Sequence, residues 1–447
     1  MPSTGNEAIK QEQLRHMHIV YANAEVTLIA AAGKDASAGL PGVPGRPRRQ
    51  QPGALIQGHA VVCIPPDPSL HVRAGSTWAT RGWTYQEGLL ARRRLFFSEH
   101  EMSYECRHML CREAMRLPLD LERGMSGYQP RLMEPFWMYE RHMLPGMDAS
   151  HTGIGLFKLL EIYLTRQLSL PSDILNTMLG ILNLLAQYKK RPIYHICGVP
   201  ILKLRDDSES NTNSDTEVAA PAALGGFLDG LCWELRERAH RRPGFPSWSW
   251  TGWQGVVTTS KSKYNRPIKQ THGFGIDVSI IPRNQDRSAA VPWSRCYDQL
   301  RMVDDSNPEI RSGQQHILEI TASAVTVRFR KANCERKPDA WIGTVCAGDD
   351  VWRGEFFLTR KDEGDDDNVL LSLLLQETWT GIVVGNSQSS PYPDMHNTIV
   401  LVVQEQEQKQ QQEDGQEHTY CERIGLLSLM HCTLKGNMLE RRTWRLQ

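Results

Sequence analysis

The sequence lacks an excess of charge of either sign. Its 447 residues include 51 Lys and Arg and 51 Asp and Glu, so the formal net charge at pH 7 is +0. Proteins that bind nucleic acid through its phosphates normally carry a surplus of basic residues. The balance therefore excludes a dedicated nucleic-acid binder, and we expect any basic patch to be local.

Long apolar runs are also missing. No stretch approaches the roughly 20 residues that cross a bilayer, and residues 1–7 have no apolar core of the kind found in signal peptides. The ten cysteines contain no Cys-x-x-Cys pair, which favours reduced thiols over a disulfide framework. We therefore expect a soluble, cytoplasmic protein without a membrane span.

Signatures of bound cofactors are absent as well. The sequence around Gly153 and Gly155 has neither a preceding strand nor the third glycine of a dinucleotide-binding loop, and no phosphate-binding loop is found. Four potential zinc ligands lie close together but match no common ligand spacing: His100, Cys106, His108 and Cys111. We expect no metal and no resident cofactor.

What is present first is an α/β pattern at the N-terminus. Residues 7–21 have apolar side chains at helical spacing and lead into the apolar run 26–33, which predicts a helix and then a buried strand. Residues 41–53 predict a loop, and residues 60–64 predict a second short strand. With a helix and a strand expected between Arg81 and Phe97, these elements predict an α/β domain over residues 1–115.

The rest of the chain changes character twice. Helical periodicity at 154–168 and 172–185 predicts a helical region over residues 116–255, with an exposed, mobile insertion at 206–217. Over residues 256–447, β-type runs alternate with inserts rich in Asp, Gly, Gln and Glu, notably 361–368 and 404–416. This last region is expected to be β-rich, with disordered inserts.

The middle region is expected to end in a Trp-rich strand at residues 245–253. Trp248 and Trp250 alternate there with Ser and Thr, so that on a strand both indoles would point to one face. Large aromatic side chains usually stabilise a protein by burial, and we interpret the pair as core. A platform on which a ligand stacks is the alternative.

Residues 81–90 concentrate unlike side chains in one short segment, with Arg81, Trp83, Gln86 and Glu87. If Thr80 caps the helix, Trp83 and Glu87 fall four apart on one face and the carboxylate is free. If Thr84 caps it, Glu87 reaches back to the Thr84 amide in a capping box. The two helix starts give Glu87 opposite roles, and both stay open.

Two interpretations are possible for the neighbouring basic residues and for Cys106. Arg81 has the geometry to pair with a carboxylate or phosphate, and the triplet that ends in Arg94 forms either an anion-binding or partner-facing edge or a solvated face. Cys106 follows a β-type stretch with no base beside it in sequence, so we expect a buried, inert thiol rather than a nucleophile.

Three blocks of the sequence, in order over its first 255 residues, resemble the fungal heterokaryon-incompatibility (HET) domain proteins. The first block runs from Ile19 through Tyr21 and Ala24 to Thr27 and Ala31, and on to Gly39-Leu40-Pro41-Gly42. The second is the segment 81–90 with the following Arg94 and Cys106. The third contains Tyr163, Arg166, Ser172-Asp173, Leu179-Gly180 and then residues 245–253, with Trp248, Trp250 and Trp253.

The resemblance implies a protein of fungal non-self recognition and regulated cell death, acting as a signalling or effector protein. It implies a distantly TIR-like fold for the partial HET domain at 1–115, a protein partner, and possible self-association. The Trp83-x-x-x-Glu87 spacing is similar to that of NAD-cleaving TIR domains, which implies the alternative of a NAD glycohydrolase with Glu87 as its catalytic carboxylate and NAD as its substrate.

The resemblance also implies roles for single residues. Arg81, Trp83, Gln86 and Arg94 are expected to contact a substrate or partner. Tyr21, Ala24, Gly39, Leu40, Cys106, Trp248, Trp250 and Trp253 are expected to form the structural signature. Because the family's domain normally begins upstream, with a strand that this sequence does not contain, an inactive truncated paralogue is a further alternative.

Overall fold

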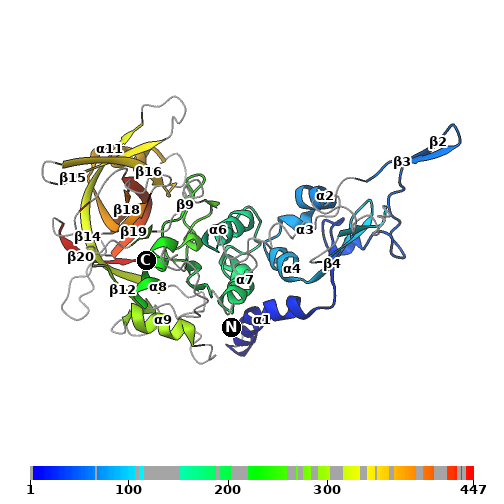
Figure 1. Cartoon of the computed structure of the whole chain (residues 1–447), viewed down its shortest axis with the longest axis horizontal. Helices are drawn as coiled ribbons and strands as arrows, with labels where there is room; N and C mark the ends of the chain where they lie inside the picture. Colours follow the sequence, from blue (N-terminus) through cyan, green and yellow to red (C-terminus); the bar gives the residue numbers. More distant parts are fainter. Residues whose placement is uncertain are drawn as a thin grey trace, which may run out of the picture. The chain divides into compact units, whose positions relative to one another are not determined.

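The structure is a computed structural model that describes residues 4–65, 68–106, 110–114, 152–187, 192–202, 220–258, 268–269, 275–282, 290–302, 316–332, 340–347, 350–361, 367–388, 396–406, 420–429, 434 and 439–447 (Figure 1). Contacts divide the chain into two compact units. Unit 1 comprises Met1–Ser150 with Ile162–Leu184, and unit 2 comprises His151–Glu161 with Leu185–Gln447. The three regions expected from the sequence stay a prediction.

Unit 1 is built on a four-stranded sheet of order β1-β4-β5-β6. β1 (Thr27–Ala30) pairs in parallel with β4 (Arg93–Phe97), and β5 (Met102–Cys106) and β6 (Leu110–Arg112) continue from β4 as antiparallel neighbours. Helices α2 (Pro68–Gly75), α3 (Thr77–Thr80) and α4 (Trp83–Leu90) gather beside the sheet, and α1 (Thr4–Asn23) packs against α4 (Figure 1). Helices and strands are therefore combined at the N-terminus, as the sequence predicts.

One expectation for this unit needs correction, and a second is confirmed. The strand predicted at 26–33 exists as β1, but it is not buried: only Ile29 is closed off, while Leu28 is 57% exposed. In the described sheet β1 is an edge strand, and its side chains alternate between the buried Ile29 and exposed neighbours, so one face is covered and the other is open. The strand predicted at 60–64 forms as β3 (His59–Val62), but it pairs only with β2 (Gly53–Ile56) in a separate hairpin.

Unit 2 contains a ten-stranded sheet whose centre is a closed circuit of six antiparallel strands. The circuit runs through β14 (His316–Lys331), β15 (Trp341–Ala347), β16 (Asp350–Leu358), β19 (Tyr420–Leu429), β18 (His396–Gln406) and β17 (Trp379–Gln388), which returns to β14. β14 reaches around the circuit because it is 16 residues long and pairs with different strands along its length. The prediction of a β-rich C-terminal region is confirmed.

Two further strands pair with the first half of β14. β12 (Asp277–Pro282) pairs with β14 and with the short β13 (Val291–Pro292), and β20 (Arg441–Leu446) pairs with β14 and β19. β11 (Ile268–Lys269) adds to β17, and β9 (Glu234–Leu235) pairs with β10 (Val257–Thr258). The insert expected at 206–217 lies outside the described residues, as do most of 361–368 and 404–416; the described ends of the last two belong to α11 (Asp367–Gln376) and β18.

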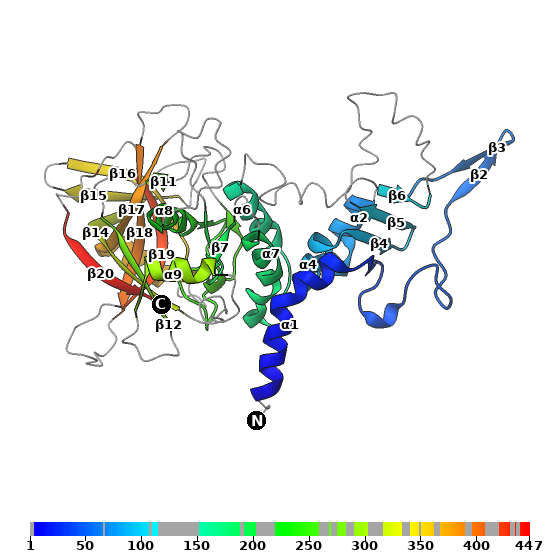
Figure 2. The same ribbon diagram turned by 60° about the horizontal axis from the view of Figure 1, so that its bottom comes forward.

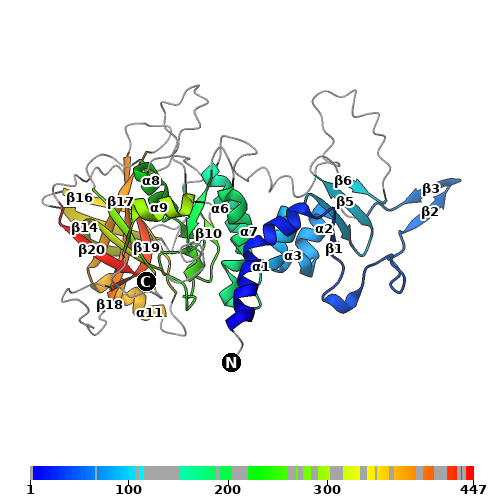
Figure 3. The same cartoon turned by 90° about the horizontal axis from the view of Figure 1, so that it is seen from below.

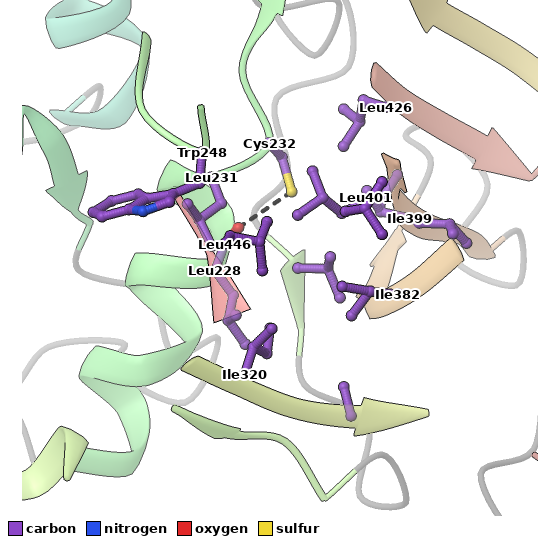
Figure 4. Packing of buried hydrophobic residues seen from close by; sticks show 14 of the residues in the cluster. Leu228, Leu231, Cys232, Trp248, Ile320, Ile382, Ile399, Leu401, Leu426 and Leu446 are labelled. Atoms are coloured by element: carbon purple, nitrogen blue, oxygen red, sulfur yellow. Dashed lines mark hydrogen bonds between the residues drawn. The ribbon is translucent and has the colours of Figure 1, made fainter. Parts of the chain in front are cut away.

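The core of unit 2 lies between this sheet and the helices α8 (Ala220–Gly230) and α9 (Trp293–Arg301) (Figure 2), and Leu370 and Leu374 of α11 also belong to it. α9 buries residues three and four apart, Trp293, Cys296, Tyr297 and Leu300, as an amphipathic helix does. Figure 4 shows part of the core, in which side chains of α8 and of the residue that follows it gather with those of five strands: Leu228, Leu231, Ile320, Ile382, Leu401, Leu426 and Leu446.

The helical region predicted between the two sheets is present in part. α6 (Thr152–Tyr163) and α7 (Asn176–Ala186) overlap the predicted stretches 154–168 and 172–185. Ser172 and Asp173 belong to a short 3-10 turn, η4 (Pro171–Asp173), and α7 begins only at Asn176. None of the helices that the structure describes is long and apolar enough to cross a bilayer.

Close packing of α8 on the hairpin β7–β8 gives a first testable prediction. β7 (Tyr194–Ile196) and β8 (Val199–Ile201) lead to Leu202, whose amide donates to the Gly226 carbonyl at 3.2 Å. A Cβ at Gly226 would lie 1.7 Å from the Leu202 carbonyl oxygen, a backbone atom that no rotamer change can move. We expect Gly226→Ala to lower the unfolding free energy of unit 2 by about 1–3 kcal/mol, despite the better helix propensity of alanine.

The measurement is amide hydrogen exchange of the full chain, which resolves the stability of each unit separately. Gly75→Ala in α2 is the matched control, because nothing lies within 4 Å of a Cβ built there. We expect unchanged exchange in that variant. Slow exchange of α8 and β8 amides in Gly226→Ala, equal to wild type, would contradict the packing described.

Candidate functional site

The segment 81–90 forms a corner between two helices. Ser76 caps α3, and its Oγ accepts the Ala79 amide at 3.1 Å. The chain then leaves α3 at Arg81, and α4 starts at Trp83 with Gly82 as its N-cap and no side-chain cap. A Cβ at Gly82 would lie 2.4 Å from Leu168 Cδ2, so a larger residue at this corner would force the Leu168 side chain to shift.

Both helix starts predicted from the sequence are therefore wrong. Thr80 Oγ1 donates to the Thr77 carbonyl at 2.9 Å, within the last turn of α3. Thr84 Oγ1 donates to the Arg81 carbonyl at 2.8 Å. Neither threonine caps α4, so Glu87 does not complete a capping box.

Glu87 instead accepts hydrogen bonds from two other helices. The Trp78 Nε1 of α3 donates to Glu87 Oε2 at 3.0 Å, and the Tyr21 hydroxyl of α1 donates to the same carboxylate. Trp78 is 7% exposed and packs edge-on against Phe96, with ring centroids 6.0 Å apart. The indole beside Glu87 is thus Trp78 rather than Trp83, and the half-buried carboxylate joins α1, α3 and α4.

The contact with Glu87 gives a prediction for Tyr21. Burial and then the Glu87 charge raise the pKa of Tyr21 from 10.0 to about 12. Because the folded pKa is raised, this group's contribution to the stability of unit 1 is present below pH 10 and is lost as pH rises towards 12. We expect Glu87→Gln, which removes the charge, to lower the pKa of Tyr21.

Ultraviolet titration of tyrosinate in wild type and in Tyr21→Phe assigns the Tyr21 step by difference, and the same titration is repeated in Glu87→Gln with and without Tyr21→Phe. Unit 1 of Tyr21→Phe should also lose less stability between pH 10 and 12. A Tyr21 pKa that Glu87→Gln leaves unmoved would show that the carboxylate does not contact the phenol.

Tyr85 of α4 packs against Tyr163 and Arg166, which belong to the third sequence block. The Tyr85 ring lies 5.8 Å from that of Tyr163, and the Arg166 guanidinium sits 4.7 Å above Tyr85. Arg166 Nη1 also donates to the Arg81 carbonyl at 3.3 Å. Residues of the second and third sequence blocks that lie more than 70 positions apart in the chain therefore meet at the Tyr85 ring.

Gln86 makes a second contact of this kind and is completely buried. Its Nε2 donates to the Asn176 carbonyl at the start of α7, at 3.2 Å. A Cβ at Gly180 would lie 2.1 Å from Gln86 Oε1 and 3.3 Å from His18 Cβ, so α1, α4 and α7 pack closely at this glycine. Gln86 is a packing residue, and the expectation that it contacts a substrate or partner is wrong.

Arg94 is also interior rather than partner-facing. Its Nη1 donates to the Gly88 and Ala91 carbonyls at 2.7 Å each, where it satisfies the end of α4. Its Nη2 lies 3.1 Å from Glu105 Oε1, and both side chains are 1% exposed. The expected contact of Arg94 with a substrate or partner is therefore wrong. Cys106, which follows this glutamate, is half-buried rather than buried as expected.

The remaining signature residues of the first block shape the chain around β1. The Ala24 amide donates to the Val20 carbonyl at 3.0 Å at the end of α1. Gly39 has φ +66°, which favours glycine, and its carbonyl accepts from Arg46 Nη1 at 2.9 Å. The half-buried Leu40 offers its carbonyl to the Val43 amide at 3.2 Å.

The Trp-rich segment belongs to unit 2 and is not a strand. Trp250–Gly252 form a 3-10 turn, η5, so the predicted alternation of faces does not occur. Trp248, Trp250 and Trp253 are all 0% exposed. Each Nε1 donates to a backbone carbonyl, of His316, Gly198 and Ser247 respectively, at 2.8–3.3 Å. The interpretation as core is confirmed, and a ligand-stacking platform is excluded.

A two-residue hairpin turn docks onto this segment. Cys197 and Gly198 both have positive φ, +49° and +87°, as a type I′ turn between β7 and β8 requires. Ser249 Oγ donates to the Cys197 carbonyl at 2.6 Å, and a Cβ at Gly198 would lie 2.9 Å from Trp250 Cζ2. The tryptophans thus hold the turn against the core.

Of the predicted contact residues, Arg81 and Trp83 remain at the surface, together with the half-buried Glu87. Sequence reasoning missed Trp78, Tyr85 and the link from Tyr21 to Glu87. The sequence offered one indication of Trp78: it lies nine residues before Glu87, in a segment for which Ser76 is a possible helix N-cap. Its relevance depends on the break at Gly82, which no local pattern reveals.

The potential metal ligands of the sequence are not gathered into a described metal site. Among the residues that the structure describes, no group of three or more His, Cys, Asp or Glu is placed to hold a metal. His108 lies outside the described residues. The rings of His71 and His100 meet edge-on at 5.0 Å, and burial, then His71 and Arg49, lower the pKa of His100.

Comparison with known families adds one finding. Residues 4–87 match the model of the family described as heterokaryon incompatibility protein (HET). The match runs from the start of α1 to Glu87, so it contains both ends of the hydrogen bond between Tyr21 and Glu87. The chain therefore carries HET-domain sequence at its N-terminus, as the first two blocks predict. No curated protein and no solved structure matches the chain.

Proposed function

We propose that this is a heterokaryon-incompatibility-type protein that acts in fungal non-self recognition and regulated cell death. The observation that carries the proposal is the HET family match over residues 4–87. It is supported by the packing of unit 1, where the matched residues Tyr21, Trp78 and Glu87 form one hydrogen-bonded group. Such a group fixes how three helices of the matched segment present their exposed side chains.

The finer parts of the proposal concern location and partners. We place the protein in the cytoplasm, with unit 1 as the effector and a protein partner that regulates it. The exposed Arg81 and the half-buried Trp83 are the side chains of the segment 81–90 that remain for such a contact. A distant TIR-like relationship of the HET domain belongs to this proposal as well.

Induced expression of the full chain in a filamentous fungus tests the proposal, with colony viability as the readout. We expect wild type to reduce viability, and Arg81→Glu with Trp83→Ala to restore it while the protein level stays the same. Glu25→Ala is the matched control, because Glu25 lies in the same unit with its side chain 88% exposed. Full viability in cells that accumulate wild-type protein would count against an effector.

The second candidate is a NAD glycohydrolase with Glu87 as its catalytic carboxylate. What favours it is the orientation of a half-buried carboxylate by the Trp78 indole, 3.0 Å away. A fixed carboxylate can stabilise the oxocarbenium-like transition state that forms as nicotinamide leaves ribose. In a glycohydrolase of this kind NAD is the substrate, and the enzyme uses no resident cofactor.

Nicotinamide release by purified full chain tests this candidate. Glu87→Gln keeps an acceptor for Trp78 but removes the negative charge, so a catalytic role predicts a loss of at least about 100-fold. Equal rates for wild type and Glu87→Gln would end the catalytic assignment. If neither activity is found and the amides of unit 1 exchange without protection, the chain is better described as an inactive paralogue.

A further inference from the structure

The hairpin β2–β3 stands apart from every other strand that the structure describes. Its register pairs Gly53 with Val62 and Ile56 with His59, and it joins no other sheet. Gln57 and Gly58 at its tip have φ +51° and +81°, as a type I′ turn requires. In all three whole-chain views the hairpin projects away from the four-stranded sheet of unit 1 (Figure 1, Figure 2 and Figure 3).

The side chains of this hairpin are those of a buried strand. Leu55 and Val62 lie on one face and Ile56 and Val61 on the other, because residues opposite in the register share a face. All four are exposed, by 49–77%, as is Ile64 just beyond them. A hairpin with one solvated face would alternate apolar and polar residues, whereas apolar residues on both faces are typical of strands covered on both sides.

An isolated two-stranded hairpin is at best marginally stable in water. Its open strand edges also offer unpaired backbone donors and acceptors to another strand. Natural edge strands are usually protected by charged residues or by proline within the strand. Residues 53–62 contain neither, and no Asp, Glu, Lys or Arg occurs from Gln50 to Pro65.

We propose that this hairpin is a self-association surface, and that its occupant is the same hairpin of a second copy of the chain. An uncharged segment meets its own copy without like-charge repulsion, while a charged partner would find nothing complementary to bind. Edge-to-edge pairing satisfies the open backbone groups, and a two-fold axis closes the contact as a dimer.

A lipid surface fits the observations less well. Anionic membranes attract apolar segments that are flanked by free basic residues. The basic residues just before the hairpin are largely engaged within unit 1: Arg46 forms an ion pair with Glu99, and Arg48 forms one with Glu113. A second copy therefore remains the better occupant. This inference does not depend on the proposed function.

Sedimentation velocity of the full chain over a range of concentrations tests the proposal. We expect a concentration-dependent dimer in wild type, and an at least tenfold weaker dimer in the double variant Leu55→Lys with Val61→Lys, which places a charge on each face. Leu170→Lys is the matched control, because Leu170 is a 57% exposed leucine of the same unit outside the hairpin, and it should dimerise as wild type does.

Amide exchange across the dilution series provides a second measurement that does not rely on a variant. Residues 53–62 should be protected where the dimer forms and unprotected where the protein is monomeric. A monomer at all concentrations, a dimer that the lysine variant leaves intact, or protection that does not change on dilution would each overturn the proposal. Hairpin-dependent binding of monomer to phosphatidylcholine–phosphatidylserine vesicles would assign the surface to lipid instead.

Discussion

Arg94→Ala is expected to destabilise unit 1 by about 3–5 kcal/mol, because it breaks a buried ion pair on one side only. The change leaves the Glu105 carboxylate, 1% exposed, without the guanidinium that lies 3.1 Å from it. It also removes the donor that reaches the Gly88 and Ala91 carbonyls at the end of α4. Desolvated groups that lose a partner cost more than the pair contributes when both partners are present.

The neighbouring Arg93 supplies the matched control. Its ion pair with Glu25 joins side chains that are 48% and 88% exposed, so Arg93→Ala should change stability by less than about 0.5 kcal/mol. Amide exchange of α4 and β4 in the full chain measures both variants, since a single unfolding transition is not defined for a chain of two units. Equal protection in Arg94→Ala and Arg93→Ala would show that the buried pair contributes nothing.

Arg423→Ala is expected to destabilise unit 2 by a similar amount, about 3–5 kcal/mol, through lost packing and lost hydrogen bonds. Arg423 is completely buried, and its guanidinium lies 3.6 Å from the centroid of the Trp233 ring. Its Nη1 donates to the Leu231 carbonyl at 2.7 Å, and its Nη2 donates to the Trp233 carbonyl. Burial lowers the pKa of Arg423 to about 9, which means that burying the charged guanidinium is unfavourable in free energy.

Arg423→Met separates the contribution of packing from that of the hydrogen bonds. Methionine fills much of the same volume and removes the buried charge, but leaves both carbonyls without a donor, so we expect a smaller loss of about 1–3 kcal/mol. Arg442→Ala, at a 58% exposed side chain of β20, is the control and should leave exchange of β19 unchanged. A larger loss in the methionine variant than in the alanine variant would contradict this division.

The regular parts of the fold follow from sequence periodicity. Alternation between Leu318 and Val327 predicts a strand, and β14 forms there because the period of two matches a sheet with one covered face. The helix and strand before Ala32 are predicted by the same reasoning. Where periodicity is strong and long, tertiary contacts reinforce the local preference.

The arrangement of the site could not be predicted from local sequence, because residues far away in the sequence determine it. The start of α4 depends on Gly82, which packs against Leu168 from a segment more than 80 residues later. The role of Glu87 depends on Trp78 and Tyr21, on two other helices. Similarly, alternating Trp and Ser at 248–250 fits a strand and a tight turn equally well, and the hairpin turn at Gly198 selects the turn.

The link between the folded HET-containing unit and cell death is tested most directly by viability after induction of three full-length proteins in one fungal host. The account predicts that wild type and Arg93→Ala reduce viability alike, whereas Arg94→Ala, whose unit 1 is destabilised, does not. Equal loss of viability with all three proteins at matched levels, or none with wild type, would contradict it.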